Sequence, residues 1–180
     1  MTSIFHVPSR EEVSANNQTI FDSLNKQLGF VPNLYATFAL NETALADYLQ
    51  LQNRKSTLKA KEREVINLVV SEVNKCDYCL AAHTTIGKMN GFSEEQILEI
   101  RQGKATFDSK LDALARFTRN ITVNRSIPDA AASQTLVEAG YTTAQIVDII
   151  IVIGDKMISN FLNGVAATPI DFPVAEPLSA

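Results

Sequence analysis

The sequence predicts an all-α fold, a single-domain helical bundle of about eight helices. Apolar residues recur every three or four positions along most of the chain, and no segment shows the strict alternation that is typical of a half-buried strand. Glycines and capping residues divide this pattern into segments of ordinary helix length. Because 180 residues are enough to bury one substantial core, we expect one domain over 1–180, with irregular arms at about 1–14 and 168–180.

The first helices are separated by short connections. Residues 16–28 place apolar side chains on one face, and Gly29 follows as a helix stop. Pro32 is typical of a first helical position and predicts a short helix through Leu40. A further helix is expected over 42–54, where apolar residues again share a stripe.

The middle of the chain predicts a central pair of helices. Residues 59–73 are apolar almost all round, which indicates a well-buried element. Asn74 interrupts this run and is expected to cap a second helix over 75–90, which Gly91 ends.

The remaining helices are each marked by a cap, a proline or a glycine. They are expected over 93–102, 108–124, 128–139 and 143–163. The last is apolar around almost its whole circumference, which predicts burial on every side and, in so small a domain, a subunit interface. We interpret Asp155 and Lys156, within that helix, as an interface pair or a solvated edge.

Composition and charge exclude several classes of function. The net charge is −4 and the chain has no basic run, so we expect no nucleic acid partner. The N-terminus lacks the regions of a secretory signal, and the apolar run 149–153 is too short to cross a membrane. We therefore expect a cytoplasmic protein with no membrane partner. In that reducing compartment a close cysteine pair is more often catalytic, redox-sensing or metal-binding than a permanent disulfide.

Cys76, Cys79 and His83 form the most informative pattern. Steps of three and four residues place side chains on one face of a helix, so these three lie on one stripe. Two thiols at this spacing can close to a disulfide with little backbone movement, and the imidazole can take or return a proton. With Asn74 as the cap, Cys76 is expected in the first turn, where free N–H groups favour a thiolate.

Glu64 is the expected partner of His83. It lies on the preceding buried helix, where a carboxylate is costly unless it is paired. An imidazole would satisfy it, and the carboxylate would fix the tautomer of the imidazole. The result is a Glu–His–Cys proton relay that depends on contact between two helices. The helix start favours Cys76 as the thiolate, whereas His83 favours Cys79.

Taken together, the pattern is Glu64, eleven intervening residues, and then Cys76-x-x-Cys79-x-x-x-His83. It resembles the alkylhydroperoxidase D-like, peroxidase-related branch of the carboxymuconolactone decarboxylase superfamily. Further similar segments are Val70-Ser71, Asn74, Tyr78, Asn160-Phe-Leu-Asn163 and Asp171-Phe-Pro173. The resemblance implies an all-helical homo-oligomer (dimer, trimer or hexamer) that reduces hydrogen peroxide or organic hydroperoxides, with no cofactor and no metal.

The resemblance also implies roles for individual residues. Cys79 attacks the peroxide, while Cys76 closes the disulfide and meets a thiol or dithiol reductant of the lipoyl or thioredoxin type. Glu64 and His83 form the proton relay. Tyr78 departs from the pattern, because the best-studied enzymes carry a histidine there. We expect the Tyr78 hydroxyl to line the substrate entrance, and Ser71 to make a hydrogen bond in the site.

Three alternatives stay open. A carboxymuconolactone decarboxylase-like enzyme would have no use for two adjacent thiols. A non-enzymatic redox sensor or scaffold would be oxidised without turnover. A zinc site would use both cysteines, His83 and Glu64, although the sequence has no second cluster of cysteine or histidine.

Overall fold

The computed structural model describes residues 4–125 and 127–178. Within these ranges the chain forms one short 3-10 helix, nine α-helices and no strand, so the expected all-α fold is confirmed. Each of the nine α-helices in the described residues corresponds to a segment expected to be helical, against the overall expectation of about eight. In chain order the elements are η1 (Arg10–Glu12), α1 (Ala15–Leu28), α2 (Asn33–Phe38), α3 (Ala44–Gln52), α4 (Ala60–Val73), α5 (Asp77–Met89), α6 (Glu94–Arg101), α7 (Ser109–Val123), α8 (Ala130–Glu138) and α9 (Thr143–Ala166).

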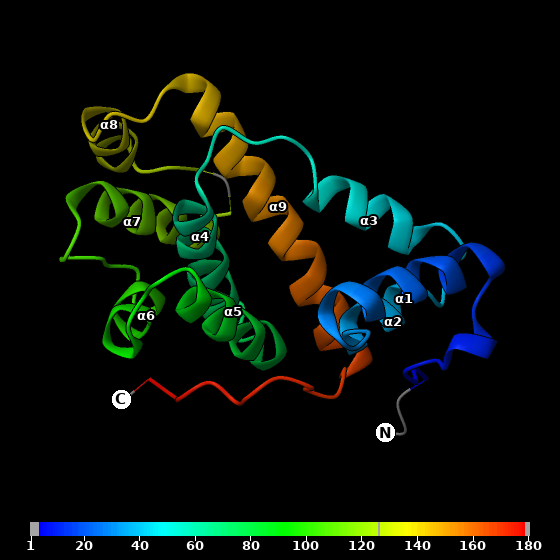
Figure 1. The fold of residues 1–180 in the computed structure, drawn as a ribbon. Coiled ribbons are helices and arrows are strands. Elements are labelled where there is room, and N and C mark those ends of the chain that lie inside the picture. The colour runs from blue at the N-terminus through cyan, green and yellow to red at the C-terminus, as the bar shows by residue number, and fades with distance from the viewer. Residues whose placement is uncertain (1–3, 126, 179–180) are drawn as a thin grey trace.

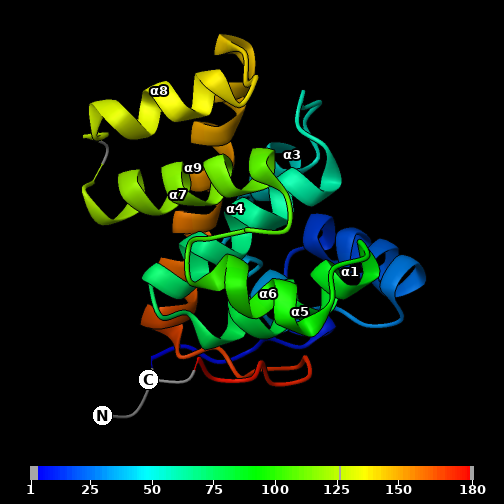
Figure 2. The ribbon, with the colours of Figure 1, turned by 90° about the vertical axis from the view of Figure 1, so that its left-hand side faces the viewer.

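Helix α4 is the centre of the larger group of helices (Figure 1). It contacts α5, α6, α7 and α9, and its apolar side chains between Val65 and Val70 are fully buried. Helix α8 packs on α7, on the side of α7 away from α5 and α6 (Figure 2). The burial of α4 among these helices explains why residues 59–73 are apolar around nearly the whole circumference.

Helices α1, α2 and α3 form a smaller group on the other side of α9 (Figure 1). A hydrophobic cluster in this group includes Phe21 and Tyr48, and it extends to Cys76, Tyr78 and Cys79 at the start of α5. The two cysteines therefore lie where the N-terminal helices meet the α4–α5 pair.

Helix α9 passes between the two groups of helices (Figure 1). Its length and composition would allow it to cross a membrane, although 44% of its most apolar window is buried inside the protein. The prediction of burial on every side is wrong for the single chain, because Val147, Ile150, Phe161 and Val165 are exposed. The interpretation of Asp155 and Lys156 as a solvated edge is also wrong, because both side chains are buried.

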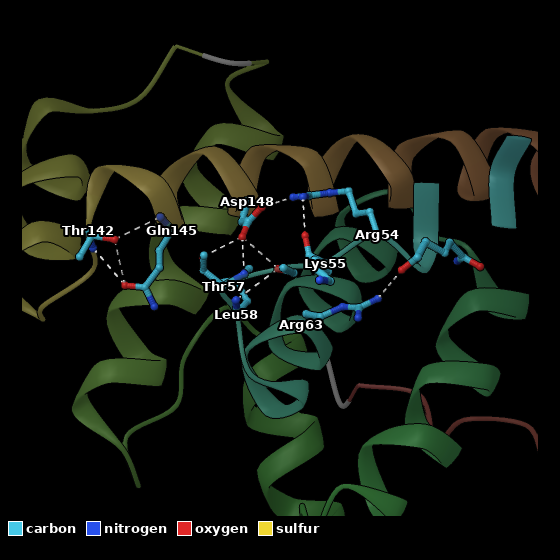
Figure 3. A network of polar contacts seen from close by, with 10 residues as sticks. Arg54, Lys55, Thr57, Leu58, Arg63, Thr142, Gln145 and Asp148 are labelled. Atoms are coloured by element: carbon cyan, nitrogen blue, oxygen red, sulfur yellow. Dashed lines mark hydrogen bonds and ion pairs between the residues drawn. The ribbon is translucent and has the colours of Figure 1, made fainter. Parts of the chain in front are cut away.

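The connection between α3 and α4 is fixed to α9 by Asp148 (Figure 3). Its carboxylate accepts hydrogen bonds from the N–H and hydroxyl groups of Thr57 and from the hydroxyl of Ser56, and it pairs with Arg54. Desolvation raises the pKa of Asp148, but these donors outweigh it and hold the pKa well below its ordinary value. The network fixes α9 relative to the start of α4.

The described part of the C-terminal tail folds back along its own chain. The backbone N–H of Asn33 donates to Asp171 (2.7 Å), and the ring of Phe172 packs edge-on against Tyr78 at the start of α5. Farther along, the Arg101 guanidinium donates to the carbonyl of Glu176. The tail thereby covers the end of the molecule at which α5 begins.

Candidate active site

The turn between α4 and α5 determines where the cysteines lie. Lys75, just after α4, adopts the left-handed conformation with φ of +53°. Its N–H donates to the carbonyl of Glu72 (3.1 Å), and the N–H of Cys76 donates to the carbonyl of Ser71 (3.0 Å). These two bonds form a Schellman motif, which is usually built on glycine. The motif ends α4 and turns the chain directly into the next helix.

Helix α5 starts later than the sequence suggested. Cys76 is its N-cap and Asp77 its first residue. Asn74, the predicted cap, instead closes α4, and its side chain donates to Asn160 of α9 (2.9 Å). The prediction that Cys76 lies inside the first turn is therefore wrong. Cys79 occupies that turn, where unpaired N–H groups and the helix dipole favour a negative charge.

Glu64 and His83 are in direct contact. The Oε2 atom of Glu64 lies 2.8 Å from Nδ1 of His83, and both side chains are buried. The other carboxylate oxygen accepts a hydrogen bond from Asn67 (3.0 Å). Burial raises the pKa of Glu64, but His83, the charge of Lys156 and the Asn67 amide outweigh burial and lower it. The Glu64 carboxylate therefore stays charged, and it can orient the His83 imidazole by accepting a hydrogen bond from it.

The two thiols differ in their tendency to ionise. The hydrogen bond between them lowers the pKa of Cys79 and raises that of Cys76. Burial raises the pKa of both, while the charges of Lys156 and His83 lower the pKa of Cys79 further. The proton therefore stays on Cys76, and Cys79 carries the negative charge. This resolves the conflict between the helix start and His83, since both now favour Cys79.

Asn163, near the end of α9, contacts both sulfurs. Its Nδ2 atom donates to Sγ of Cys79 at 3.2 Å and approaches Sγ of Cys76 at 3.8 Å. The Asn163 carbonyl also accepts the N–H groups of Ala167 and Thr168, which close the C-terminus of α9. One residue thus joins the end of α9 to the cysteine pair. Its only sequence signal was its place in the segment Asn160-Phe-Leu-Asn163.

Lys156 is a second residue of the site that sequence reasoning missed. It is 2% exposed in the middle of α9, and its charge lowers the pKa of both Glu64 and Cys79. A buried ammonium is costly unless anions lie nearby, and the Glu64 carboxylate and the Cys79 thiolate provide them. A lysine inside an apolar helix was the available signal, but only the packing of α9 on α4 and α5 shows which groups it faces.

Ser71 and Tyr78 have different surroundings from those of the sulfurs. The Ser71 hydroxyl is fully buried and accepts a hydrogen bond from Asn160 (3.4 Å), so it joins α4 to α9. The Tyr78 hydroxyl accepts the backbone N–H of Leu34 (3.1 Å), which joins α5 to α2. Burial raises the pKa of Tyr78, so its hydroxyl stays protonated. Tyr78 also lines a surface pocket beside Cys76.

The sulfurs also differ in access. The pocket beside Cys76 has a volume of about 310 Å³, and Cys79 does not line it. Within residues 4–125 and 127–178, no group of three or more histidine, cysteine, aspartate or glutamate side chains is arranged to hold a metal ion. The site is thus a buried thiolate at Cys79, a more accessible thiol at Cys76, and the Glu64–His83 pair with Lys156 nearby.

The middle of the chain matches a known protein family. The model of the Carboxymuconolactone decarboxylase family matches residues 39–118, a range that contains Glu64, Cys76, Cys79 and His83. A comparison with curated proteins finds no match.

Solved structures share the fold over nearly the whole chain. An uncharacterized peroxidase-related protein from Silicibacter sp. TM1040 is 25% identical, with a TM-score of 0.81, covering 93% of this chain and 91% of that chain. An uncharacterized peroxidase-related protein from Ralstonia eutropha JMP134, described as an alkylhydroperoxidase AhpD core, is 20% identical, with a TM-score of 0.84 and coverage of 95% and 93%. A variant of the debrominase Bmp8 in complex with 2,3,4-tribromopyrrole is 15% identical, with a TM-score of 0.77 and coverage of 95% and 93%.

These findings agree on one assignment. The family model covers the helices that carry Glu64, both cysteines and His83. The peroxidase-related structures share the fold over 93% and 95% of this chain. The chain is therefore similar to the Carboxymuconolactone decarboxylase family over residues 39–118, and it shares its fold with the peroxidase-related structures.

Proposed function

We propose that the protein is a thiol-dependent peroxidase that reduces hydrogen peroxide or organic hydroperoxides through a disulfide cycle of Cys76 and Cys79. The observation that carries the proposal is the asymmetry of the two thiols. Cys79 receives hydrogen bonds from Cys76 and Asn163 and lies near the charge of Lys156, all of which stabilise a thiolate. A thiolate with a thiol beside it is the arrangement that peroxide reduction requires.

The first half of the cycle oxidises the pair. The Cys79 thiolate attacks the terminal oxygen of the hydroperoxide, the O–O bond breaks, and Cys79 becomes a sulfenic acid. His83 gives its proton to the departing alkoxide, which leaves as an alcohol, or as water in the case of hydrogen peroxide. The Cys76 sulfur then attacks the sulfenic sulfur, the S–O bond breaks and the disulfide forms. The proton of Cys76 passes through His83 to the departing hydroxide, which leaves as water.

Glu64 acts through His83. Its carboxylate accepts the Nδ1–H of the imidazole, which leaves Nε2 as the atom that exchanges protons. The negative charge of Glu64 also stabilises the imidazolium that forms when Cys76 loses its proton. Glu64 is therefore a positioning residue, whereas Cys79, Cys76 and His83 take part in the chemistry.

The second half of the cycle needs a reductant. A thiol or dithiol would attack the disulfide and restore both cysteines. Cys76 is the sulfur that lines a surface pocket, so the reductant would meet Cys76. Tyr78 lines the same pocket and would contact the incoming molecule.

We also propose that the protein is a homo-oligomer and that the exposed face of α9 forms its interface. Val147, Ile150, Phe161 and Val165 recur at helical spacing along that face and are between 49% and 71% exposed. The same face borders an apolar hollow of about 1070 Å³ that is also lined by α7 and α8. A continuous exposed apolar surface of this kind is typical of a protein–protein interface.

One experiment tests the peroxidase proposal. Fully reduced protein receives one equivalent of cumene hydroperoxide, and its intact mass is measured with Cys76→Ser and Cys79→Ser alongside. We expect the wild type to lose two hydrogen atoms, a loss that dithiothreitol reverses. Cys76→Ser should gain one oxygen, because its sulfenic acid has no thiol partner. Cys79→Ser should remain unmodified.

Other outcomes would favour other functions. An unchanged mass in the wild type would contradict the proposal. Consumption of a muconolactone with the thiols unchanged would favour a decarboxylase-like enzyme. A disulfide that forms but never turns over with any thiol would favour a redox sensor, and stoichiometric zinc in protein purified without chelator would favour a metal site. Debromination of a bromopyrrole would link the chain to the reaction of the debrominase that shares its fold.

A further inference from the structure

The pocket beside Cys76 contains more than an accessible sulfur. It lies between the start of α5, the end of α9 and the first residues of the tail, and its volume is about 310 Å³. Cys76, Asn163 and Thr168 line it together with Lys75, Asp77 and Ile170. This volume is within the range of pockets that hold small ligands.

Two polar atoms in the pocket wall lack a partner. Oδ1 of Asn163 and Oγ1 of Thr168 are both buried, and neither forms a hydrogen bond within the described residues. The two residues are only 5% and 8% exposed. A buried polar atom without a partner costs free energy, and native structures rarely tolerate two side by side. Their shared position in this pocket points to a ligand that supplies the missing hydrogen bonds.

The backbone explains why these two buried atoms belong to residues that line the same pocket. The Asn163 amide turns its nitrogen toward the sulfurs, so its oxygen lies on the opposite side of the same amide group. Ala167 adopts the left-handed conformation with φ of +49°. This turn brings Thr168 back against the end of α9, where its N–H donates to the Asn163 carbonyl (3.3 Å). The two side chains are therefore held together in one wall.

The distances limit the shape of the ligand. The nitrogen of the Asn163 amide is 3.8 Å from Sγ of Cys76, so the oxygen of the same amide lies at most one amide width farther from that sulfur. A ligand whose sulfur bonds to Cys76 could also donate to Asn163 only if its donor group lay two or three bonds from the ligand sulfur. Oδ1 of Asn163 requires a donor, whereas Oγ1 of Thr168 can donate or accept. An amide has both an N–H and a C=O group.

We propose that this pocket is the reductant site and that it takes a small thiol whose amide N–H lies two or three bonds from the sulfur. Asn163 accepts the N–H and Thr168 donates to the amide carbonyl, each after a small rotation of its side chain. Lys75, which lines the same pocket, contributes a positive charge that attracts the attacking thiolate. This inference rests on the proposed disulfide cycle and names the chemical class of its reductant.

The reaction balances in two thiol–disulfide exchanges. The ligand thiolate attacks Sγ of Cys76, forming a mixed disulfide and expelling the Cys79 thiolate, which Asn163 and Lys156 stabilise. A second ligand thiolate then attacks the ligand sulfur of the mixed disulfide and expels Cys76, which takes a proton from solvent. One protein disulfide and two thiols thus become two cysteines and one ligand disulfide. Attack at Cys76 is favoured because the thiol with the lower pKa is the better leaving group.

A matched pair of small thiols tests this inference. N-acetylcysteamine carries an amide two carbons from its sulfur, and 2-mercaptoethyl acetate has the same length with an ester in place of the amide. Diamide first forms the Cys76–Cys79 disulfide, and each small thiol then reduces it. The two second-order rate constants are compared after each is divided by the fraction of that thiol that is ionised. We expect the amide to react about fivefold faster or more, since one hydrogen bond separates the two thiols.

Variants link the reaction to the pocket. Thr168→Val keeps the shape of the side chain and removes the hydroxyl that donates to the carbonyl, a group that both thiols carry, so both rate constants should fall. Thr118→Val is the matched control, because the Thr118 hydroxyl is also buried without a partner but lies on α7 away from the pocket. N-acetylcysteine amide, run alongside, distinguishes a peptide thiol from an acylated cysteamine. Only the cysteine derivative is branched, at the second carbon from its sulfur.

Two results would overturn the inference. Equal rates for amide and ester in the wild type would show that the pocket does not recognise the amide. Rate constants for Thr168→Val that equal those for Thr118→Val with both thiols would show that the Thr168 hydroxyl does not bind the ligand. Because diamide forms the disulfide, either result leaves the peroxide reaction itself untouched. If no Cys76–Cys79 disulfide forms even with diamide, the proposed function and this inference both fail.

Discussion

At the scale of single residues, the main feature is the concentration of groups that stabilise a negative charge on Cys79. The thiol of Cys76, the amide of Asn163 and the charge of Lys156 come from three different places in the chain. Each lowers the pKa of Cys79 against the opposing effect of burial. The sequence alone predicted the contact between Glu64 and His83 that the structure has, but it did not identify which thiol is ionised.

The reactivity of Cys79 should therefore persist at low pH. A lowered pKa means that the thiolate remains until the pH falls below the lowered value, whereas an ordinary thiol is mostly protonated below about 8.5. Alkylation of reduced protein by iodoacetamide, located by peptide mass spectrometry, should have its midpoint for Cys79 well below that value. A midpoint at or above the ordinary value would contradict the assignment of the thiolate.

Replacement of Asn163 should raise that midpoint. Asn163→Leu removes a hydrogen bond to a charged sulfur, which is worth about 1.5–3 kcal/mol, or roughly 1–2 pH units. The same alkylation profile measures the shift. Asn25→Leu, an exposed residue of α1, should leave the midpoint unchanged. Equal profiles for the two variants would show that the Asn163 amide does not stabilise the thiolate.

Glu64 should affect stability in a pH-dependent way. Its pKa is lowered on folding, so it stabilises the folded state above the ordinary glutamate pKa of about 4.3, and this contribution is lost as the pH falls through the lowered value. Chemical denaturation should show Glu64→Gln less stable than the wild type by about 3 kcal/mol at neutral pH, because the substitution breaks a buried pair. The difference should shrink as the pH is lowered below about 4.

A remote glutamate provides the control. Glu138→Gln replaces an exposed side chain on α8 and should change the free energy of unfolding by about 0.5 kcal/mol or less at any pH. A difference for Glu64→Gln that stays constant with pH would mean that its carboxylate gains nothing from His83 on folding.

At the scale of elements, the turn between α4 and α5 decides the geometry of the site. The periodicity of the sequence predicted both helices, and the structure has them within a few residues of the expected ends. The sequence pattern misplaced the boundary between the two helices, because asparagine such as Asn74 is common at both ends of helices. The left-handed conformation of Lys75 could not be predicted, since non-glycine residues seldom adopt it. Because α5 starts two residues later than expected, Cys79 lies in its first turn and Cys76 is its N-cap.

Lys75→Gly should stabilise the protein. Glycine adopts the left-handed conformation without the penalty of about 1 kcal/mol that a Cβ atom incurs. We expect a Tm increase of roughly 2–4 °C in a chain of this size, measured by differential scanning calorimetry. Lys26→Gly, near the end of α1, should lower the Tm instead, because glycine is a poor helix former. A lower Tm for Lys75→Gly would show that the side chain of Lys75 matters more than its backbone.

At the scale of the whole molecule, the site exists because α9 packs against α4 and α5. Asn163 and Lys156 follow the cysteines by about eighty residues, and the sequence pattern of an apolar helix did not distinguish them from solvated groups. The family resemblance indicated the segment that contains Asn163 but not its contact with the sulfurs. Contacts between distant elements depend on packing, so they required the folded structure.

The exposed face of α9 should control assembly. Phe161→Asp places a charge in the proposed interface and should convert the oligomer to a smaller species, because burying an unpaired charge is costly. Size-exclusion chromatography with multi-angle light scattering measures the mass. Met89→Asp, at an 81% exposed position on α5, is the control and should leave the mass unchanged. A wild type that is monomeric at every concentration tested would contradict the proposed interface.

The most direct measurement of the central claim is the location of the first oxidised sulfur. Cys76→Ser and Cys79→Ser are each treated with one equivalent of cumene hydroperoxide in the presence of dimedone, which traps sulfenic acids, and the adduct is mapped by peptide mass spectrometry. The account predicts an adduct at Cys79 in Cys76→Ser and none in Cys79→Ser. An adduct at Cys76 in Cys79→Ser that forms at least as fast, or no adduct in either variant, would contradict it.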